Sequence, residues 1–185
     1  MKGFALSLLF FVFAICLILL FKAMTGPDAQ AIVSKYSPTY RELAQNSVLD
    51  SGPKTLDVVI DVIDGDTIEL ASGERVRYLG INAPEMLTSY KKGECYAREA
   101  KEQNKELVFG KKVYLIRDIS DRDKYGRLLR YVYTEDAFVN FMLAEGGYAK
   151  AQIFAPDTKY ASLLRAAQQD AQDENRGVWN ICRKK

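Results

Sequence analysis

The chain of 185 residues contains no histidine. This absence excludes Ser-His-Asp and Cys-His nucleophilic sites, histidine general bases, and zinc sites that depend on imidazole. The three cysteines lie far apart in the sequence, so a thiolate metal site is not expected either. What remains for hydrolytic chemistry is carboxylate, arginine and tyrosine side chains, with a hard cation held by oxygen ligands.

The chain also lacks an excess of either charge. It has 26 basic and 24 acidic residues, and residues 55–185 contain 21 of each. A protein that holds duplex nucleic acid through a broad phosphate footprint is normally strongly basic. Any binding site for a polyanion must therefore be a local cluster of charge.

Cysteine is scarce, and Cys16 falls within an apolar run, which leaves Cys95 and Cys182 for the rest of the chain. If that part is exported, a disulfide between them would contribute about 4–5 kcal/mol in the chain-entropy model. Two unrelated thiols are the alternative. The sequence leaves both readings open.

Charged residues are absent from Gly3 to Phe21. As a helix, a run of this length spans the roughly 30 Å hydrocarbon core of a bilayer, whereas a cleavable signal usually has about 7–15 apolar residues. We therefore predict a membrane anchor or signal segment at residues 1–22. An uncleaved anchor is favoured over a signal cleaved near Ala29-Gln30-Ala31. The rest of the chain is predicted to lie outside the cytoplasm, membrane-anchored or secreted.

Prolines and small polar residues punctuate residues 23–54, which predicts a stalk or linker. A single folded domain is predicted over residues 55–182. Its predicted strands are 56–62, 67–70, 75–81, 112–117 and 129–133, and its predicted helices are 96–109, 138–145 and 158–175. Three strands, a helix, two strands and two helices form the plan of a five-stranded OB-fold, a small, partly open Greek-key barrel with three helices.

Asp64-Gly65-Asp66-Thr67 joins the first two predicted strands. Residues two apart in an extended chain point the same way, so Asp64 and Asp66 can face one cation. The alternative is an Asp-Gly hairpin turn with solvated charges, and the tetrapeptide by itself favours that alternative. It is not an EF-hand loop, because Ile68 occupies the third ligand position.

Arg77 lies in the third predicted strand. Alternation along the strand places Arg77 on the same face as Leu79 and Ile81. If Leu79 and Ile81 point into the core, the charge of Arg77 lies close to the core, where the arginine needs an anionic partner or ligand. The planar fork of a guanidinium suits phosphate. A salt bridge at the rim of the barrel is the alternative.

Two further segments carry charge in restricted settings. In Asn82-Ala83-Pro84-Glu85 the proline stiffens the exit from the strand, and a glutamate there can act as a base towards water. Asp123-Lys124-Tyr125-Gly126-Arg127 supplies a second arginine. Each segment alone is weak evidence, and the second is ordinarily a solvated hairpin tip.

Taken together, these segments resemble the signature blocks of the thermonuclease (staphylococcal nuclease-like) family. The blocks are Ile63 to Thr67, Val76 to Glu85 and Asp123 to Arg127, in that order and at matching spacing. The similarity extends from about Val58 to Trp179, including the start of the helix at Tyr96, Val139-Asn140, and Gly177-Val178-Trp179. The resemblance implies an OB barrel and a calcium-dependent phosphodiesterase that acts on DNA and RNA.

The resemblance also implies roles for individual residues. Asp66 would bind calcium directly, Asp64 would lie behind it, and Ala83 would offer its carbonyl oxygen. The catalytic residues would be Arg77 and Arg127, which grip the scissile phosphate, and Glu85, which activates water. Lys124 and Tyr125 would border the nucleotide.

The chain departs from the family in two places. Asn82 stands where the family has a second calcium-ligating aspartate, so the site keeps an oxygen ligand but loses a negative charge, and calcium should bind more weakly. Gln152-Ile153-Phe154-Ala155 replaces the family's paired tyrosines and offers one aromatic ring for base stacking.

The expected partners are therefore single-stranded or flexible DNA and RNA, and a membrane through the N-terminal helix; no protein partner is implied. One alternative is a catalytically weak OB-fold module that binds nucleic acid without cutting it. A membrane-anchored scaffold with no nucleic-acid role is the other. Neither alternative explains why Arg77, Glu85 and Arg127 occur together.

Overall fold

A computed structural model describes residues 54–90 and 92–182, which belong to one compact unit, Leu43–Lys185. Five strands form a closed barrel in the order β1-β2-β3-β6-β5. These strands are β1 (Lys54–Asp64), β2 (Thr67–Leu70), β3 (Arg75–Tyr78), β5 (Lys112–Ile116) and β6 (Leu128–Tyr133). The predicted five-stranded barrel is thus confirmed, and it is closed rather than partly open.

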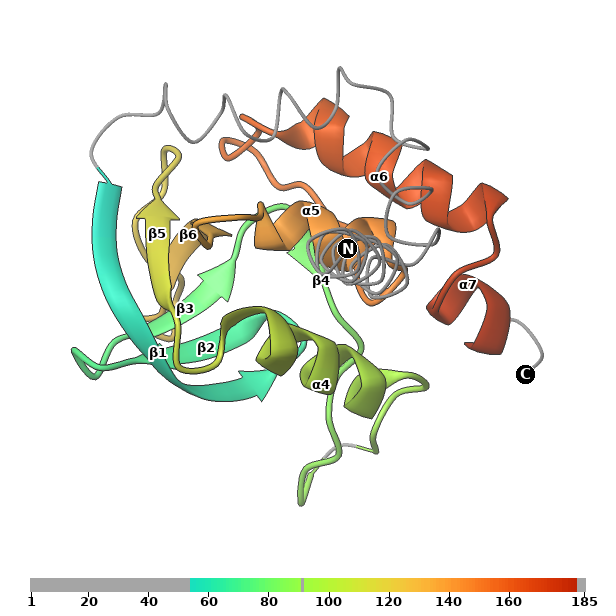
Figure 1. Ribbon diagram of the computed structural model, residues 1–185, viewed down its shortest axis with the longest axis horizontal. Helices are drawn as coiled ribbons and strands as arrows, with labels where there is room; N and C mark the ends of the chain where they lie inside the picture. The colour runs from blue at the N-terminus through green and yellow to red at the C-terminus, as the bar shows by residue number, and fades with distance from the viewer. Residues whose placement is uncertain (1–53, 91, 183–185) are drawn as a thin grey trace, which may run out of the picture. The chain divides into compact units, whose positions relative to one another are not determined.

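Closure of the barrel depends on two pairings between strands that are distant in sequence. Strand β1 pairs antiparallel with β5, and β3 pairs parallel with β6. Small and β-branched side chains such as Val59, Val76 and Val132 fill the interior. Figure 1 shows these strands curling around a common centre.

Four helices occur in the described part of the chain, one more than predicted. They are α4 (Ala97–Val108), α5 (Val139–Glu145), α6 (Ala161–Asp173) and α7 (Val178–Ile181). Helix α5 packs between the barrel and α6, and α4 packs on β1 (Figure 1). The short helix α7 was not predicted, because four residues are too few to show a helical period.

The third strand is shorter than predicted. It ends at Tyr78, because Gly80 adopts a positive φ of 75° that turns the chain. A short strand β4 (Ile81–Asn82) then pairs with an unpredicted strand β7 (Lys150–Ala151). The predicted alternation is confirmed over Arg75–Tyr78, where Val76 and Tyr78 are buried, and fails after Tyr78, where Leu79, Gly80 and Ile81 are all buried.

The last long helix begins later than predicted. Asp157, the residue before the predicted helix, does not cap it: its Oδ1 atom accepts the backbone N–H groups of Ile119 and Ser120 at 3.0 and 2.8 Å. The helix begins at Ala161 after Tyr160, with no side-chain cap. Asp157 therefore ties two loops together instead.

A disulfide joins Cys95, just before α4, to Cys182, just after α7. It closes a loop with a sequence separation of 87 residues. None of the helices in residues 54–90 and 92–182 is both long and apolar enough to cross a bilayer. The predicted anchor at 1–22 lies outside the described residues, as does the predicted stalk apart from Lys54.

Candidate active site

Arg77 lies in β3, and Arg127 immediately precedes β6, the neighbouring strand of the barrel. In the parallel pairing of β3 with β6, Arg77 stands opposite Leu129, two residues after Arg127. Paired residues in adjacent strands share a face, and so do residues two apart along an extended chain. Both arginines line one cavity of about 420 Å³, which we call the arginine cavity. Both arginines thus border one volume.

Arg77 is held rigidly before any ligand arrives. Its Nε atom lies 3.0 Å from Oδ1 of Asp66, and its side chain is 17% exposed. The two terminal nitrogens donate to the carbonyl of Ile81 and to Oδ1 of Asn82, both at 2.8 Å. Nη1 donates to the carbonyl of Tyr78 as well, so these contacts fix the orientation of the guanidinium group.

Asp66 is buried beside this arginine. Burial raises the pKa of Asp66 to about 7, and the nearby charge of Arg77 opposes that rise. Its carboxylate accepts the N–H of Ala83 at 2.6 Å and the hydroxyl of Thr67 at 3.2 Å. Asp64 accepts the backbone N–H of Asp66 at 2.9 Å. A cation would favour the ionised carboxylate, so Asp66 suits a metal ligand.

The Gly65 backbone allows these segments to approach closely. A Cβ atom at Gly65 would lie 2.6 Å from the Cβ of Ala83 and 2.8 Å from that of Ala100. The turn after β1 therefore packs directly on the segment after β4 and on α4. This contact brings Asp66 to the backbone of Ala83.

The groups predicted to bind a metal beside Asp66 all present oxygen atoms. In residues 54–90 and 92–182 no three His, Cys, Asp or Glu side chains gather into a group that could hold a metal. The donors that the sequence predicts are the carboxylates of Asp64 and Asp66, the amide oxygen of Asn82 and the carbonyl of Ala83. This set fits a hard cation such as calcium rather than zinc, with few negative charges to bind it tightly.

Asp123 orients the second arginine. The Oδ2 atom of Asp123 accepts from Nε of Arg127 at 2.7 Å, and its Oδ1 accepts the backbone N–H groups of Tyr125 and Arg127. Partial burial opposes ionisation, but these hydrogen bonds prevail and lower the pKa of Asp123. The hydrogen bonds of Asp123 therefore fix the conformation of the charged turn and orient the Arg127 side chain. Sequence reasoning assigned Asp123 no role.

Lys124 and Tyr125 flank the arginine cavity without lining it. The Tyr125 ring is 73% exposed, and Lys124 Nζ and Arg127 Cζ lie 5.0 and 5.6 Å from its centroid. Gln152 and Phe154 do line the cavity. An aromatic ring from each of two loops thus lies at or beside the arginines.

Glu85 is exposed and is not among the residues that line the arginine cavity. Its backbone pairs with Glu94: the N–H of Glu85 donates to Oε2 of Glu94 at 3.1 Å, and the N–H of Glu94 donates to the carbonyl of Glu85 at 2.9 Å. The predicted role of Glu85 stays a prediction.

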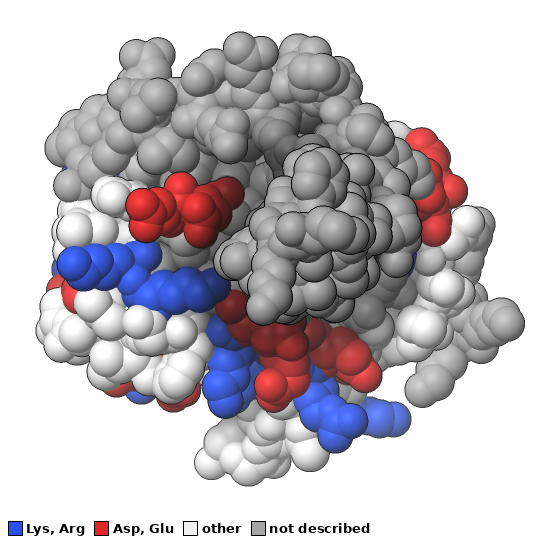
Figure 2. All heavy atoms as spheres, viewed as in Figure 1, with Lys and Arg blue, Asp and Glu red and all other residues white. Residues whose placement is uncertain are grey.

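The charges of the arginine cavity balance. Arg77 and Arg127 face Asp123 and Asp157, which line the same space. Among the described residues visible in Figure 2, basic and acidic side chains lie in neighbouring groups. The ionisable residues that line this cavity therefore carry no net charge.

Asn104 is a supporting residue that sequence reasoning did not identify. It is buried on the apolar face of α4, accepts the hydroxyl of Tyr78 at 2.9 Å and donates to the carbonyl of Asp64 at 3.0 Å. It therefore anchors the turn that carries Asp64 and Asp66. The available signal was an asparagine within a helical stripe of apolar residues.

Comparison with known proteins adds the family context. Residues 75–181 match the family model described as Staphylococcal nuclease homologue. The chain is 36% identical over 121 residues to a thermonuclease of Staphylococcus intermedius, which covers 64% of this chain and 72% of that protein.

Two Bacillus subtilis (strain 168) proteins are 38% identical to the chain. Endonuclease YncB matches over 133 residues, covering 69% of this chain and 63% of that protein. The SPbeta prophage-derived endonuclease YokF matches over 131 residues, covering 68% of this chain and 44% of that protein. The chain thus spans less than two thirds of both endonucleases.

Proposed function

The chain belongs to the staphylococcal nuclease family, and from this premise we propose that it is a calcium-dependent phosphodiesterase that cuts flexible DNA and RNA at the arginine cavity. Its thermonuclease and endonuclease relatives indicate a hydrolase of the nuclease type. Calcium, the residue roles and the substrate form are the parts we propose.

The observation that carries the proposal is the convergence of Arg77 and Arg127 on one cavity. Negative charge gathers on the phosphoryl oxygens in the transition state of phosphodiester hydrolysis. Two oriented guanidinium forks stabilise that charge more than they stabilise the ground state. Because Asp66 and Asp123 hold the forks beforehand, little reorganisation is needed during the reaction.

Asp66, Asn82 and the carbonyl of Ala83 would hold the calcium ion, with Asp64 behind them. The ion would supply charge stabilisation for the phosphate and polarise its oxygens. The balanced charges of the cavity support this requirement, since the arginines are already paired with carboxylates. With Asn82 in place of a carboxylate, the site suits the millimolar calcium found outside cells.

Glu85 would accept the proton of the attacking water. Its carboxylate is exposed next to Pro84, which restricts the backbone that carries it. The exposure leaves the carboxylate accessible to water.

A flexible strand fits the distribution of charge and aromatic groups. Tyr125 and Phe154 are 73% and 68% exposed, so each offers a ring face on which a base can stack. A rigid duplex would need the broad basic surface that the domain lacks.

The domain is proposed to work outside the cytoplasm, anchored to a membrane or secreted. The Cys95–Cys182 disulfide supports an oxidising compartment.

Cleavage of labelled single-stranded DNA by the full chain tests the proposal. We expect cleavage in calcium, its loss on chelation, and its loss in Glu85→Gln with strand binding retained. Glu102→Ala, which removes an exposed carboxylate of α4, serves as the control for lost charge. Calcium-dependent binding without cleavage by the wild type would instead indicate a binding module.

A further inference from the structure

The loop 85–94 is fastened where it begins and ends. The side chain of Glu94 accepts the N–H of Glu85, and the backbone of Glu94 donates to the carbonyl of the same residue. Gly93 packs on the loop itself, since a Cβ there would lie 3.1 Å from the backbone nitrogen of Leu87. Glu94 therefore fixes the backbone of Glu85 from both its amide and its carbonyl side.

The next residue links this loop covalently to the C-terminal part of the domain. Cys95 forms the disulfide with Cys182. Tyr96 then enters α4 with a φ of 72°, a left-handed conformation that is strained for a tyrosine. Its ring stacks on Tyr148 with 5.6 Å between the centroids. The disulfide thus holds the chain where it is already under backbone strain.

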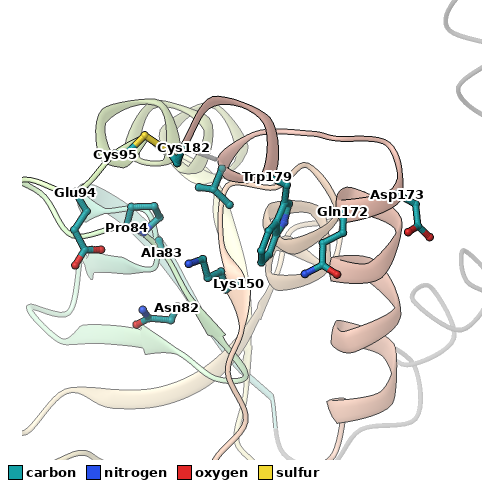
Figure 3. A pocket seen from close by; sticks show the side chains of 11 residues that line it. Asn82, Ala83, Pro84, Glu94, Cys95, Lys150, Gln172, Asp173, Trp179 and Cys182 are labelled. Atoms are coloured by element: carbon teal, nitrogen blue, oxygen red, sulfur yellow. A yellow bond between two sulfur atoms is a disulfide. The ribbon is translucent and has the colours of Figure 1, made fainter. Parts of the chain in front are cut away.

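Glu94, Cys95 and Cys182 border a cavity. This cavity of about 720 Å³ separates the segment Asn82 to Pro84 from Trp179 and its neighbours in α6 and α7. Figure 3 shows Glu94 and Asn82 on one side of it, Trp179 on the other, and the disulfide bridging them. Cys95 and Cys182 line the cavity, which gives a reductant access to them.

We propose that Glu94 is a positioning residue for Glu85, and that the Cys95–Cys182 disulfide keeps Glu94 in place. The inference rests on the proposed function, in which Glu85 accepts the proton from water. Releasing the loop lowers turnover more than binding, because Arg77 and Arg127 are mounted on the barrel and not on the loop. A small displacement of a base is enough to slow the reaction about 10–100-fold.

Two substitutions of Glu94 test the positioning role in the full chain with single-stranded DNA and saturating calcium. Glu94→Ala removes the acceptor and is expected to lower kcat at least about tenfold, with KM changed less than about twofold. Glu94→Gln keeps an acceptor oxygen and is expected to restore most of kcat. The inference is overturned if Glu94→Ala retains full kcat, if its loss lies in KM, or if the glutamine variant is equally impaired.

A second arm tests the disulfide. A dithiol reagent delivers two electrons and two protons, leaves Cys95 and Cys182 as thiols, and is itself converted to a cyclic disulfide. We expect reduction to lower kcat as Glu94→Ala does, and to lower it no further in that variant. Full kcat in the reduced protein would overturn this part. Circular dichroism monitors whether the reduced protein stays folded. If reduction unfolds the domain, the variant Cys95→Ser/Cys182→Ser in saturating calcium takes the place of the reduced protein. Full kcat in that variant would likewise overturn the proposed role of the disulfide.

Hydrogen exchange at the Glu85 amide separates this inference from the proposed function. The amide is expected to be protected in the wild type and in Glu94→Gln, and to exchange at least about tenfold faster in Glu94→Ala. If the wild type does not cleave but shows this pattern, only the proposed function fails. If the wild type cleaves and the exchange rate of the Glu85 amide does not change in Glu94→Ala, only this inference fails.

Discussion

Replacing Arg77 with alanine is expected to destabilise the fold much more than replacing Arg127, although both changes should abolish cleavage. The Asp66 side chain that faces Arg77 is only 6% exposed, whereas Arg127 and its partner Asp123 are 28% and 17% exposed. Removing one member of a buried ion pair costs about 3–5 kcal/mol. Breaking a partly solvated pair costs about 0–1 kcal/mol.

The cost at Arg77 should lie near the lower end of that range. Burial already raises the pKa of Asp66 to about 7, so without Arg77 this carboxyl can take up a proton at neutral pH instead of staying charged. The expected difference between the two alanine variants is therefore about 2–3 kcal/mol. Asp66→Asn introduced into Arg77→Ala should recover most of the stability but no activity.

Urea unfolding measures this difference. The only tryptophan of the chain, Trp179, reports unfolding by fluorescence. Arg165→Ala, at an exposed position of α6, provides the control for loss of a surface arginine. Equal losses of unfolding free energy in Arg77→Ala and Arg127→Ala would refute the reasoning from burial.

Three further outcomes are expected. Asn82→Asp should tighten calcium binding at least about tenfold by calorimetry, because it adds a carboxylate to the donor set; unchanged affinity would argue against that set. Gly65→Ala should cost about 1–3 kcal/mol and weaken calcium binding, because the new Cβ would lie 2.6 Å from that of Ala83; a fully stable variant would contradict the close packing. The hydrogen bond from Arg122 lowers the pKa of Glu74 below 4.5. The Glu74–Arg122 pair therefore adds to the free energy of unfolding above pH 4.5, and this addition is lost as Glu74 is protonated at lower pH. The difference in unfolding free energy between wild type and Arg122→Ala should shrink from about pH 5 to about pH 3.

Local patterns predicted most of the barrel. A run rich in β-branched residues predicted β1, the Asp64-Gly65 turn signal placed β2 after it, and a mostly apolar stripe at helical spacing predicted α4. The break after Tyr78 was missed, because alternating residues continue through Gly80 and only its positive φ turns the chain. Strand β7 was missed because two residues carry no period of their own.

The site was predictable in its residues but not in its geometry. The parallel pairing that sets Arg77 opposite Leu129 joins segments that are distant in sequence, so only the family resemblance suggested that Arg77 and Arg127 meet. Asp123 and Asn104 act through hydrogen bonds to backbone groups, and composition does not reveal such bonds. The placement of Asp157 depended on a loop contact rather than on helix capping.

A double-substitution cycle with Arg77→Lys and Arg127→Lys tests most directly whether both arginines act on one phosphate. Lysine keeps the charge but removes the planar fork, so the fold should survive. If both forks stabilise the same transition state, the loss of kcat/KM in the double variant will be clearly smaller than the product of the single losses. Losses that simply multiply would show two independent sites and would contradict a shared phosphate in the arginine cavity.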